Sequence, residues 1–401
     1  MTTSTLSQAG IDALHRAMEA RVAKGDLPGL VTLVAQGDDV RVDAIGAMEF
    51  GGDRPMRRDT IFRIASLTKP ILAAATMMLV DDGTLTLDEP IERLVPEMAD
   101  RRVLRRVDGP LDDTVPAERP ITIDDLLTFR MGYGHLFVPD AVPPLDPPFP
   151  VVEAARALNL VMGAPEPRTP HDPDRWIELF ASLPLMYQPG SRWNYNAGSL
   201  VLGVLVARAA GQPLDALLRA RVFEPLGMRD TGFSMPADQT GRLPSQYQTD
   251  FETGELRLQT VTGPDVWVTA PPFPSGAGGL LSTVDDYLAF ARMLLNGGRH
   301  GSGRLLSEPA VAAMTTNHLT PEQIAGGGPI LGDQGWGLGM SVTVAPDEVS
   351  AEPGRYGWAG GYGTTWFNDP RRGLIAIVMT QVSDFLWNGG VAEFSRLAAR
   401  A

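Results

Sequence analysis

Hydrophobic and polar positions repeat differently at the two ends of the chain and in its middle. Near the N-terminus, an amphipathic pattern predicts a helix over residues 7–22. Two β-rich runs around Gly37-Asp38-Asp39 then predict a hairpin over residues 29–47. Near the C-terminus, apolar runs predict strands over residues 336–344, 356–368 and 374–381, and a closing helix over residues 391–399. Both ends of the chain are therefore expected to supply strands.

The middle of the chain has mainly helical patterns. Residues 60–65 are expected to be extended, and an Ala/Met/Leu-rich run predicts a buried helix over residues 66–82, with Pro70 tolerable in its first turn. Further helices are predicted over residues 123–130, 200–210, 213–223 and 284–296. This order favours a mixed α/β (α+β) fold in which residues 1–75 and 280–401 form a sheet domain and residues 76–279 form a mostly helical inserted domain.

Two proline-rich stretches, residues 138–150 and 263–276, are too irregular for core elements. Loops of this length are often lids or pocket walls, although plain surface loops fit the pattern equally well. Whether either stretch closes over a site stays open at this point.

Composition excludes several classes of function. The net charge is −14 and no Lys- or Arg-rich run occurs, which argues against nucleic acid or an anionic membrane surface as a partner. The chain has no cysteine, so disulfides, thiolate catalysis and cysteine-ligated metals are excluded. No apolar run is long enough for a membrane span, and the N-terminus lacks a signal-peptide pattern. We expect a soluble cytoplasmic protein, whose oligomeric state the sequence does not give.

Lysine is almost absent, which makes one serine–lysine pair conspicuous. The chain has only Lys24 near the N-terminus and Lys69 in Ser66-Leu67-Thr68-Lys69. At the start of a helix, residues three apart share a face, so the Lys69 amine can reach the Ser66 hydroxyl. Apolar flanks would lower the lysine pKa and let the amine accept the serine's proton, while N–H groups at the helix start suit an oxyanion. Taken alone, a helix cap beside a surface lysine is an equally good interpretation.

The surrounding motifs resemble the serine β-lactamase/penicillin-binding superfamily, within it the class C-related branch, and most closely its family VIII carboxylesterases. The resemblance extends over most of the chain. It rests on ordered matches at residues 62–70, 82–88, 123–128, 189–195, 201–203, 223–228, 278–283, 357–361 and 367–370. It implies a β-lactamase-like fold, with an antiparallel sheet flanked by helices, and an acyl-enzyme mechanism on Ser66 without a cofactor.

The resemblance also assigns roles to further residues. Tyr195 matches the family tyrosine that faces the serine and lysine and passes the proton to the leaving group. We expect this phenol, held near Lys69, to be partly ionised; a core tyrosine bonded to the backbone is the alternative. The backbone N–H groups of Ser66 and Gly361 are where the resemblance puts the oxyanion hole. Gly360 beside it would let a substrate approach the strand closely.

Departures from the family pattern bear on the substrate. Ala197 stands where β-lactamases have the asparagine that holds a β-lactam side chain, and Phe129 stands where histidine is usual. Trp358-Ala359-Gly360 replaces the Lys-Thr-Gly or His-x-Gly motif and resembles the Trp-x-Gly of the esterases. An indole can wall a pocket but offers a carboxylate no charge, so Trp358 predicts a neutral or hydrophobic ester substrate. Arg355 nearby is a possible substitute cation.

Other site motifs are missing. There is no Gly-x-Ser-x-Gly elbow and no nucleotide-binding glycine motif. The five histidines lack metal-ligand spacing, so no metal site is expected, and His135 and His171 are expected to be bystanders in loops near the pocket.

The sequence therefore predicts a serine carboxylesterase with Ser66, Lys69 and Tyr195 as catalytic residues, acting on a small-molecule ester. Within the enzymes, the alternatives are a β-lactamase or D-amino-acid-specific peptidase/amidase, against which Trp358 and Ala197 argue, and an acyltransferase that uses the same acyl-enzyme. Outside the enzymes, the alternative is a non-catalytic binding module on the same fold, against which the intact Ser66, Lys69 and Tyr195 set argues.

Overall fold

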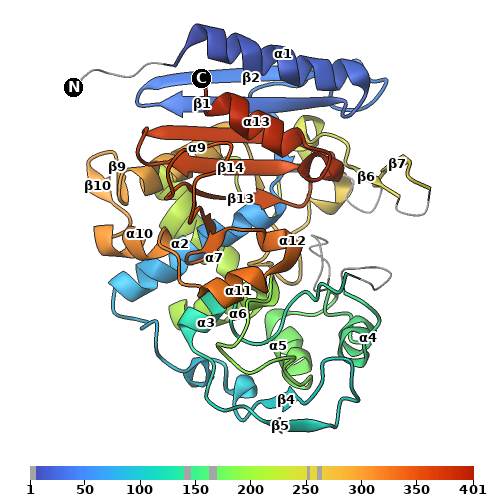
Figure 1. Ribbon diagram of the computed structural model, residues 1–401, viewed down its shortest axis with the longest axis vertical. Helices are drawn as coiled ribbons and strands as arrows, with labels where there is room; N and C mark the ends of the chain where they lie inside the picture. The colour runs from blue at the N-terminus through green and yellow to red at the C-terminus, as the bar shows by residue number, and fades with distance from the viewer. Residues whose placement is uncertain (1–5, 140–145, 162–168, 251–252, 260–263) are drawn as a thin grey trace.

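The fold is organised around one antiparallel sheet. The computed structural model describes residues 6–139, 146–161, 169–250, 253–259 and 264–401 (Figure 1). The sheet has seven strands in the order β11-β12-β13-β14-β15-β1-β2, and every neighbouring pair is antiparallel. Its strands are β1 (Gly29–Gln36), β2 (Asp39–Gly46), β11 (Gly335–Trp336), β12 (Ser341–Val342), β13 (Tyr356–Gly360), β14 (Thr364–Asp369) and β15 (Leu374–Thr380). Because β1 pairs with β15, both ends of the chain build the sheet, as predicted.

Both faces of the sheet are covered by helices, and the central strands are buried on both sides. In β1, Leu30 and Val34 belong to one hydrophobic cluster, whereas Val31 and Leu33 belong to another. This alternation follows from side chains that point to opposite faces of a strand. The first face is covered by α1 (Gln8–Lys24) and α13 (Gly390–Ala398), and the second by α9 (Val284–Leu295) (Figure 1).

The predicted helix after residue 65 is the central helix of the core. A 3-10 turn over Ala65–Leu67 leads directly into α2 (Thr68–Asp81), whose residues 68–79 are all buried. Pro70 lies in the first turn of α2, where its missing N–H has no helical partner to lose. Helix α2 packs against α6 (Ala197–Ala210), which follows Tyr195 in the chain.

The remaining elements lie mostly in the middle of the chain, beneath the sheet in the view of Figure 1. The helices are α3 (Ile123–Leu127), α4 (Pro150–Ala157), α5 (Pro173–Ala181), α7 (Leu214–Leu218), α8 (Glu224–Leu226), α10 (Glu308–Met314), α11 (Pro321–Ala325) and α12 (Gly328–Leu331). Short two-stranded pairs are β3 (Phe62–Arg63) with β8 (Leu281–Ser282), β4 (Arg102–Leu104) with β5 (Thr114–Pro116), β6 (Tyr247–Thr249) with β7 (Leu256–Leu258), and β9 (Arg299–His300) with β10 (Gly303–Arg304). The division into two domains at residues 75 and 280 stays a prediction.

Three predicted elements were wrong in extent. The strand predicted over residues 336–344 is the hairpin β11–β12, and the strand predicted over residues 356–368 is the hairpin β13–β14. Glycines make the difference, because Gly339 and Gly363 adopt φ values of 82° and 96° in the two turns. The helix predicted to reach residue 130 ends at Leu127, since Phe129 has a φ of 56° and leaves the helix.

Two sequence expectations extend beyond what the structure describes. Residues 140–145 of the stretch 138–150, and residue 263 of the stretch 263–276, lie outside the described residues. Their action as a lid stays a prediction. Among the described helices, none alone has the length and apolar composition of a membrane span, and only the bent pair Ala197–Ala210 and Leu214–Leu226 meets that test, by length and composition alone.

Candidate active site

Ser66 and Lys69 meet at the junction of the 3-10 turn and α2. The Nζ atom of Lys69 lies 2.9 Å from the Oγ atom of Ser66. Ala65, immediately before the serine, has a φ of 47°, an uncommon conformation for a residue with a side chain. Such strain persists only where the surrounding structure enforces it, and it is frequent at functional sites. The predicted proximity of the two side chains is present.

Lys69 is buried without an acidic partner. Its side chain is 1% exposed, and Nζ lies 2.5 Å from the carbonyl oxygen of Ala277 and 4.6 Å from the centre of the Tyr195 ring. No ion pair of Lys69 occurs within the described part of the chain. Burial lowers the pKa of Lys69 well below its ordinary value. A neutral amine at Ser66 has a lone pair free to accept the serine proton.

Tyr195 completes the group from the segment that leads into α6. Its hydroxyl accepts a hydrogen bond from Nε1 of Trp358 at 2.8 Å and shares a second one with the Ser66 hydroxyl. The next residue, Asn196, is held at φ 88° and ψ −57°, a second strained position beside the site. Burial raises the pKa of Tyr195, and the hydrogen bonds to Ser66 and Trp358 lower it by less. The expectation of a partly ionised phenol was therefore wrong, since the raised pKa favours the neutral hydroxyl.

The turn between β13 and β14 lies against the segment that carries the nucleophile. A Cβ atom on Gly360 would lie 2.2 Å from the carbonyl oxygen of Ile64, so only glycine fits at this contact. Gly361 follows in the turn. Neither the Ser66 N–H nor the Gly361 N–H is among the main-chain donors of the described turns, loops and caps. Their role as an oxyanion hole stays a prediction.

Trp358 places an indole side chain at the position of the third family motif. Trp358 lies in β13 and directs Nε1–H at the Tyr195 hydroxyl. Arg355, the possible substitute cation, is engaged elsewhere: its guanidinium lies 2.5 and 3.0 Å from the two carboxylate oxygens of Asp347. A bidentate pair of this kind neutralises the charge of Arg355.

Several aromatic rings pack around the ring of Tyr195. Phe129 packs edge-on against Tyr195 at 5.5 Å between ring centres, and Trp336 packs edge-on against Trp358 at 4.6 Å. Trp193 completes this aromatic wall, which we define as Phe129, Trp193, Trp336 and Trp358. Phe129 thus contributes packing at the position where the family usually has histidine. Such a wall excludes water and favours the neutral forms of Tyr195 and Lys69.

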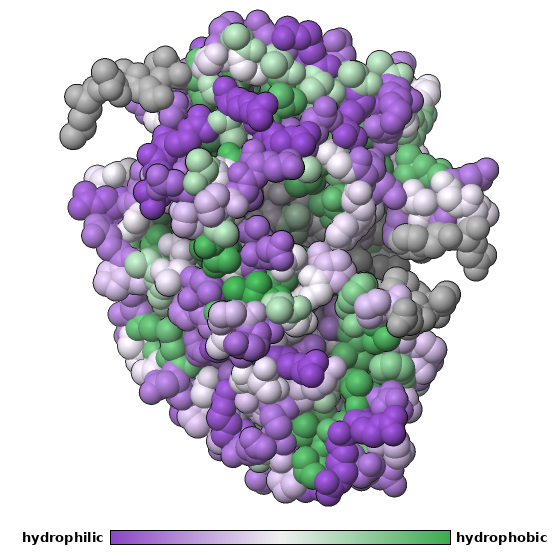
Figure 2. All heavy atoms as spheres, viewed as in Figure 1, coloured by the Kyte–Doolittle hydropathy of each residue, from purple (hydrophilic) through white to green (hydrophobic). Residues whose placement is uncertain are grey.

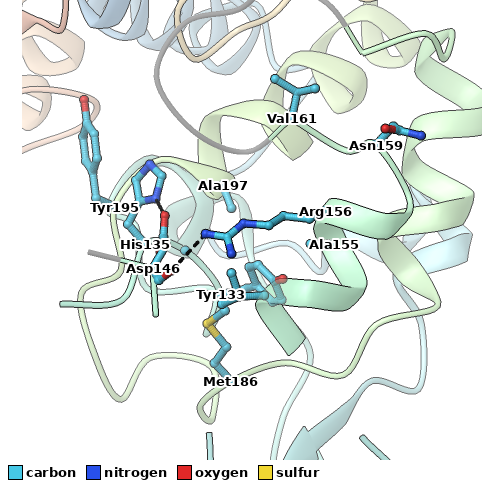
Figure 3. Close-up of a pocket in the computed structure, with 12 residues that line it drawn as sticks. Tyr133, His135, Asp146, Ala155, Arg156, Asn159, Val161, Met186, Tyr195 and Ala197 are labelled. Carbon is cyan, nitrogen blue, oxygen red and sulfur yellow. Dashed lines mark hydrogen bonds and ion pairs between the residues drawn. The ribbon is translucent and has the colours of Figure 1, made fainter. Parts of the chain in front are cut away.

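A cavity of about 320 Å³ opens beside Tyr195 and Ala197 (Figure 3). In the space-filling view, the surface is hollowed between the sheet and the helices beneath it (Figure 2). His135 and Asp146 lie in the cavity wall, so His135 is near the pocket as expected, and its role as a bystander to the chemistry stays a prediction. His171 does not line the cavity, and its Nε2 is bonded to the carbonyl oxygen of Leu158. No group of three His, Asp or Glu among the described residues is arranged to hold a metal ion.

Two features of the site were missed by the sequence analysis. The Ala277 carbonyl, which fixes the Lys69 amine, carries no side-chain signature; only its place beside Gly278 and Gly279 indicated that this segment mattered. Trp336 was taken for a strand residue alone, yet its Nε1 donates to the Leu127 carbonyl and its ring packs on Trp358.

Comparisons with known proteins agree with this geometry. The sequence pattern of the family described as Beta-lactamase matches residues 14–399. Protein Rv1367c of Mycobacterium tuberculosis (strain ATCC 25618 / H37Rv) is 40% identical over 368 residues, covering 89% of this chain and 86% of that protein. Esterase EstB of Burkholderia gladioli is 31% identical over 407 residues, covering 95% and 93%. The solved structure of EstCE1, a hydrolase with promiscuous acyltransferase activity, has a TM-score of 0.79 at 24% identity, covers 98% and 99% of the two chains, and confirms the expected fold class.

Proposed function

The chain belongs to the beta-lactamase family, and we propose that within it this protein is a serine carboxylesterase that cleaves neutral or hydrophobic esters. In the first half-reaction, Ser66 Oγ attacks the ester carbonyl while neutral Lys69 accepts the serine proton. Support comes from the 2.9 Å separation of the two atoms and from the lowered pKa of Lys69. The N–H groups of Ser66 and Gly361 would stabilise the oxyanion.

Tyr195 would carry the proton onward. Its neutral hydroxyl can donate to the leaving alkoxide as the carbon–oxygen bond breaks, and the proton taken by Lys69 replaces it. The alcohol departs and leaves the acyl group on Ser66. Water then attacks the acyl-enzyme with Tyr195 or Lys69 as base, which releases the carboxylic acid and returns the proton to Ser66. Ser66, Lys69 and Tyr195 therefore end the cycle in the protonation states in which they began it. Apart from the ester and water, the reaction needs no other reactant.

The observation that carries the proposal is the hydrogen bond from Trp358 Nε1 to the Tyr195 hydroxyl. In this arrangement the third motif orients the proton donor and supplies no cation for a substrate carboxylate. Arg355 does not make up for the missing charge, because Asp347 pairs with it at 2.5 Å. A substrate that depends on a carboxylate anchor, such as a β-lactam or a peptide C-terminus, would bind poorly here.

The test is hydrolysis of short- and medium-chain p-nitrophenyl esters beside a chromogenic cephalosporin, with wild type and Ser66→Ala. We expect ester turnover that disappears in Ser66→Ala, with little cephalosporin turnover by either protein. A matched control is Ser307→Ala, since Ser307 caps α10 far from the site, and it should retain ester turnover. Cephalosporin turnover equal to ester turnover would contradict the argument from Trp358. Absence of turnover on both substrates would contradict the proposed function itself.

A further inference from the structure

The cavity beside Tyr195 contains a histidine–aspartate pair that the proposed mechanism does not use. Nδ1 of His135 lies 2.5 Å from Oδ2 of Asp146, and the other carboxylate oxygen of Asp146 accepts the backbone N–H of Leu136 at 2.9 Å. The side chains are 10% and 23% exposed. Arg156 donates to the main-chain carbonyl of Asp146 at 3.0 Å, so the segment that carries the carboxylate is held from a second side (Figure 3).

This pair is fixed to the candidate active site. The backbone N–H of His135 donates to the carbonyl oxygen of Tyr195 at 2.9 Å, and the two rings lie 6.0 Å apart with 30° between their planes. Burial raises the pKa of Asp146, but the hydrogen bond and charge of His135 outweigh it, and the pKa falls below its ordinary value. The hydrogen bond to Asp146 fixes the orientation of the His135 ring through Nδ1. Nε2 of His135 bonds to no described residue and is the polar atom that the ring has left for a ligand in the cavity wall.

Of the proposed catalytic residues, Tyr195 is the one that lines the cavity. In the proposed mechanism the leaving oxygen takes its proton from the Tyr195 hydroxyl, which is bonded to Trp358 Nε1. Neither Trp358 nor Ser66 lines the cavity, which runs from Tyr195 past His135 toward Arg156 and Asn159 (Figure 3). We assign the leaving alcohol to the Tyr195 hydroxyl, beside Trp358, and the acyl chain to the cavity beside Tyr195.

The lining also includes the apolar side chains of Val152, Ala155, Val161 and Met186, beside the polar side chains of Arg156 and Asn159. Resting on the proposed function, we propose that this cavity binds the acyl group of the ester and that His135, oriented by Asp146, selects acyl chains bearing a hydroxyl group. A hydroxyl group, which can both donate and accept, pairs with Nε2 of His135, and the apolar side chains of the lining receive the carbon chain. A plain alkyl chain leaves Nε2 desolvated and without a partner, which is costly in a buried site. His135 acts here as a specificity-determining residue.

The test compares p-nitrophenyl octanoate with matched hydroxyoctanoates in which the hydroxyl group moves along the chain. We expect wild type to favour at least one hydroxy ester by about tenfold in kcat/KM, mainly through KM, because the contact forms before the chemical step. In His135→Phe the ratio should fall to about one, and Asp146→Asn should reduce it in part. His300→Phe, in the remote β9–β10 hairpin, is the matched control and should keep the wild-type ratio.

Two results would overturn the inference while leaving the proposed function intact. One is ester turnover without a preference for any hydroxy ester. The other is an unchanged ratio in His135→Phe, with both esters slowed equally, as a purely structural role would produce. Failure of the proposed function has a separate signature, since no p-nitrophenyl ester would then be turned over and a fluorophosphonate would not label Ser66. That result would overturn both proposals.

Discussion

The two lysines of the chain occupy opposite environments. Lys24 ends α1 at the surface, where its side chain is 77% exposed and pairs with Asp26 at 3.2 Å. Lys69 begins α2 in the core, where its side chain is 1% exposed and its amine meets a serine hydroxyl and a carbonyl oxygen. The same side chain is thus a solvated cation in one place and a desolvated amine in the other. Packing produces this difference between two identical side chains.

The choice of partner decides what Lys69 can do. A carboxylate beside a buried lysine stabilises its charged form and keeps the proton on the amine. The Ala277 carbonyl accepts one N–H of Lys69 without adding a negative charge. The aromatic wall beyond Tyr195 then excludes the water that would favour the ammonium form. Together these features favour the neutral amine that the proposed role of Lys69 as a base requires.

The largest predicted effect comes from removing the Lys69 amine. We expect Lys69→Met to lose at least about 10³-fold in kcat/KM for ester hydrolysis, the scale of an essential acid–base group. Lys69→Arg should be as inactive, because arginine does not give up its proton. Lys24→Met is the matched control and should retain wild-type rates, since Lys24 is exposed at the end of α1. Ester hydrolysis by Lys69→Met at the wild-type rate would contradict the difference in role that we assign to the two lysines.

Removing the Tyr195 hydroxyl should have the next largest effect. Tyr195→Phe keeps the ring and its packing against Phe129 but removes the donor to the leaving group. We expect kcat for ester hydrolysis to fall about 10²-fold. Tyr187→Phe, whose ring is half-buried beneath Arg192, serves as the control. Equal rates for Tyr195→Phe and wild type would leave Lys69 as the sole proton carrier.

The pH dependence of kcat/KM tests whether Lys69 acts as a desolvated, neutral amine. Lys69 is active as the neutral amine, so kcat/KM should rise about tenfold per pH unit below its pKa and then level off. Because burial lowers that pKa, the plateau should begin well below pH 10.5. Ionisation of Tyr195 should not end the plateau near neutral pH, because burial raises its pKa. Measured profiles that rise until about pH 10.5 would contradict a desolvated Lys69.

Stability should depend on pH through the same residue. Between the lowered pKa of Lys69 and about 10.4, the unfolded chain binds a proton that the folded chain does not, so the free energy of unfolding rises with pH. The slope from this residue is at most about 1.4 kcal/mol per pH unit. Lys69→Met lacks it, and wild type should therefore gain stability relative to Lys69→Met as the pH rises. Urea unfolding of both proteins across this window measures the difference, and parallel curves would refute the prediction.

The smallest predicted effect concerns Trp358. Trp358→Phe keeps an aromatic ring in β13 but removes the N–H that donates to Tyr195. Loss of one hydrogen bond corresponds to about 1 kcal/mol, so we expect kcat to fall roughly fivefold. Trp387→Phe, at an exposed position far from the site, controls for the substitution itself. A loss as large as that of Tyr195→Phe would mean that Trp358 does more than orient the phenol.

Much of this site could be predicted from the sequence because its parts lie in short motifs. The spacing of Ser66 and Lys69 at a helix start fixes their contact, and the match to the third family motif pointed to Trp358, whose Nε1 donates to Tyr195. Substrate binding by Trp358 stays a prediction. Strand extents were less predictable, since the glycines at 339 and 363 fold predicted strands back into hairpins. Glycine permits a turn without requiring one. Whether the chain turns at these glycines therefore depends on the strands with which the flanking residues pair.

The charge states and the cavity could not be predicted from the sequence. Tyr195 was expected to be partly ionised, but its pKa depends on the surrounding rings, Phe129 and Trp336 among them, which come from distant segments. His135 and Asp146 are eleven residues apart along the chain, and Asp146 is also bonded by the Leu136 N–H and by Arg156. Long-range packing of this kind leaves no local pattern in the sequence.

The most direct test of the central claim is NMR titration of the lysine side chains. Because the chain has two lysines, ¹³Cε labelling of lysine gives two signals, which Lys69→Met and Lys24→Arg assign. Our account predicts that the Lys69 signal titrates well below the ordinary value of 10.5 in the folded wild-type enzyme. A Lys69 signal that titrates at or above 10.5 would contradict a neutral Lys69 acting as the base for Ser66.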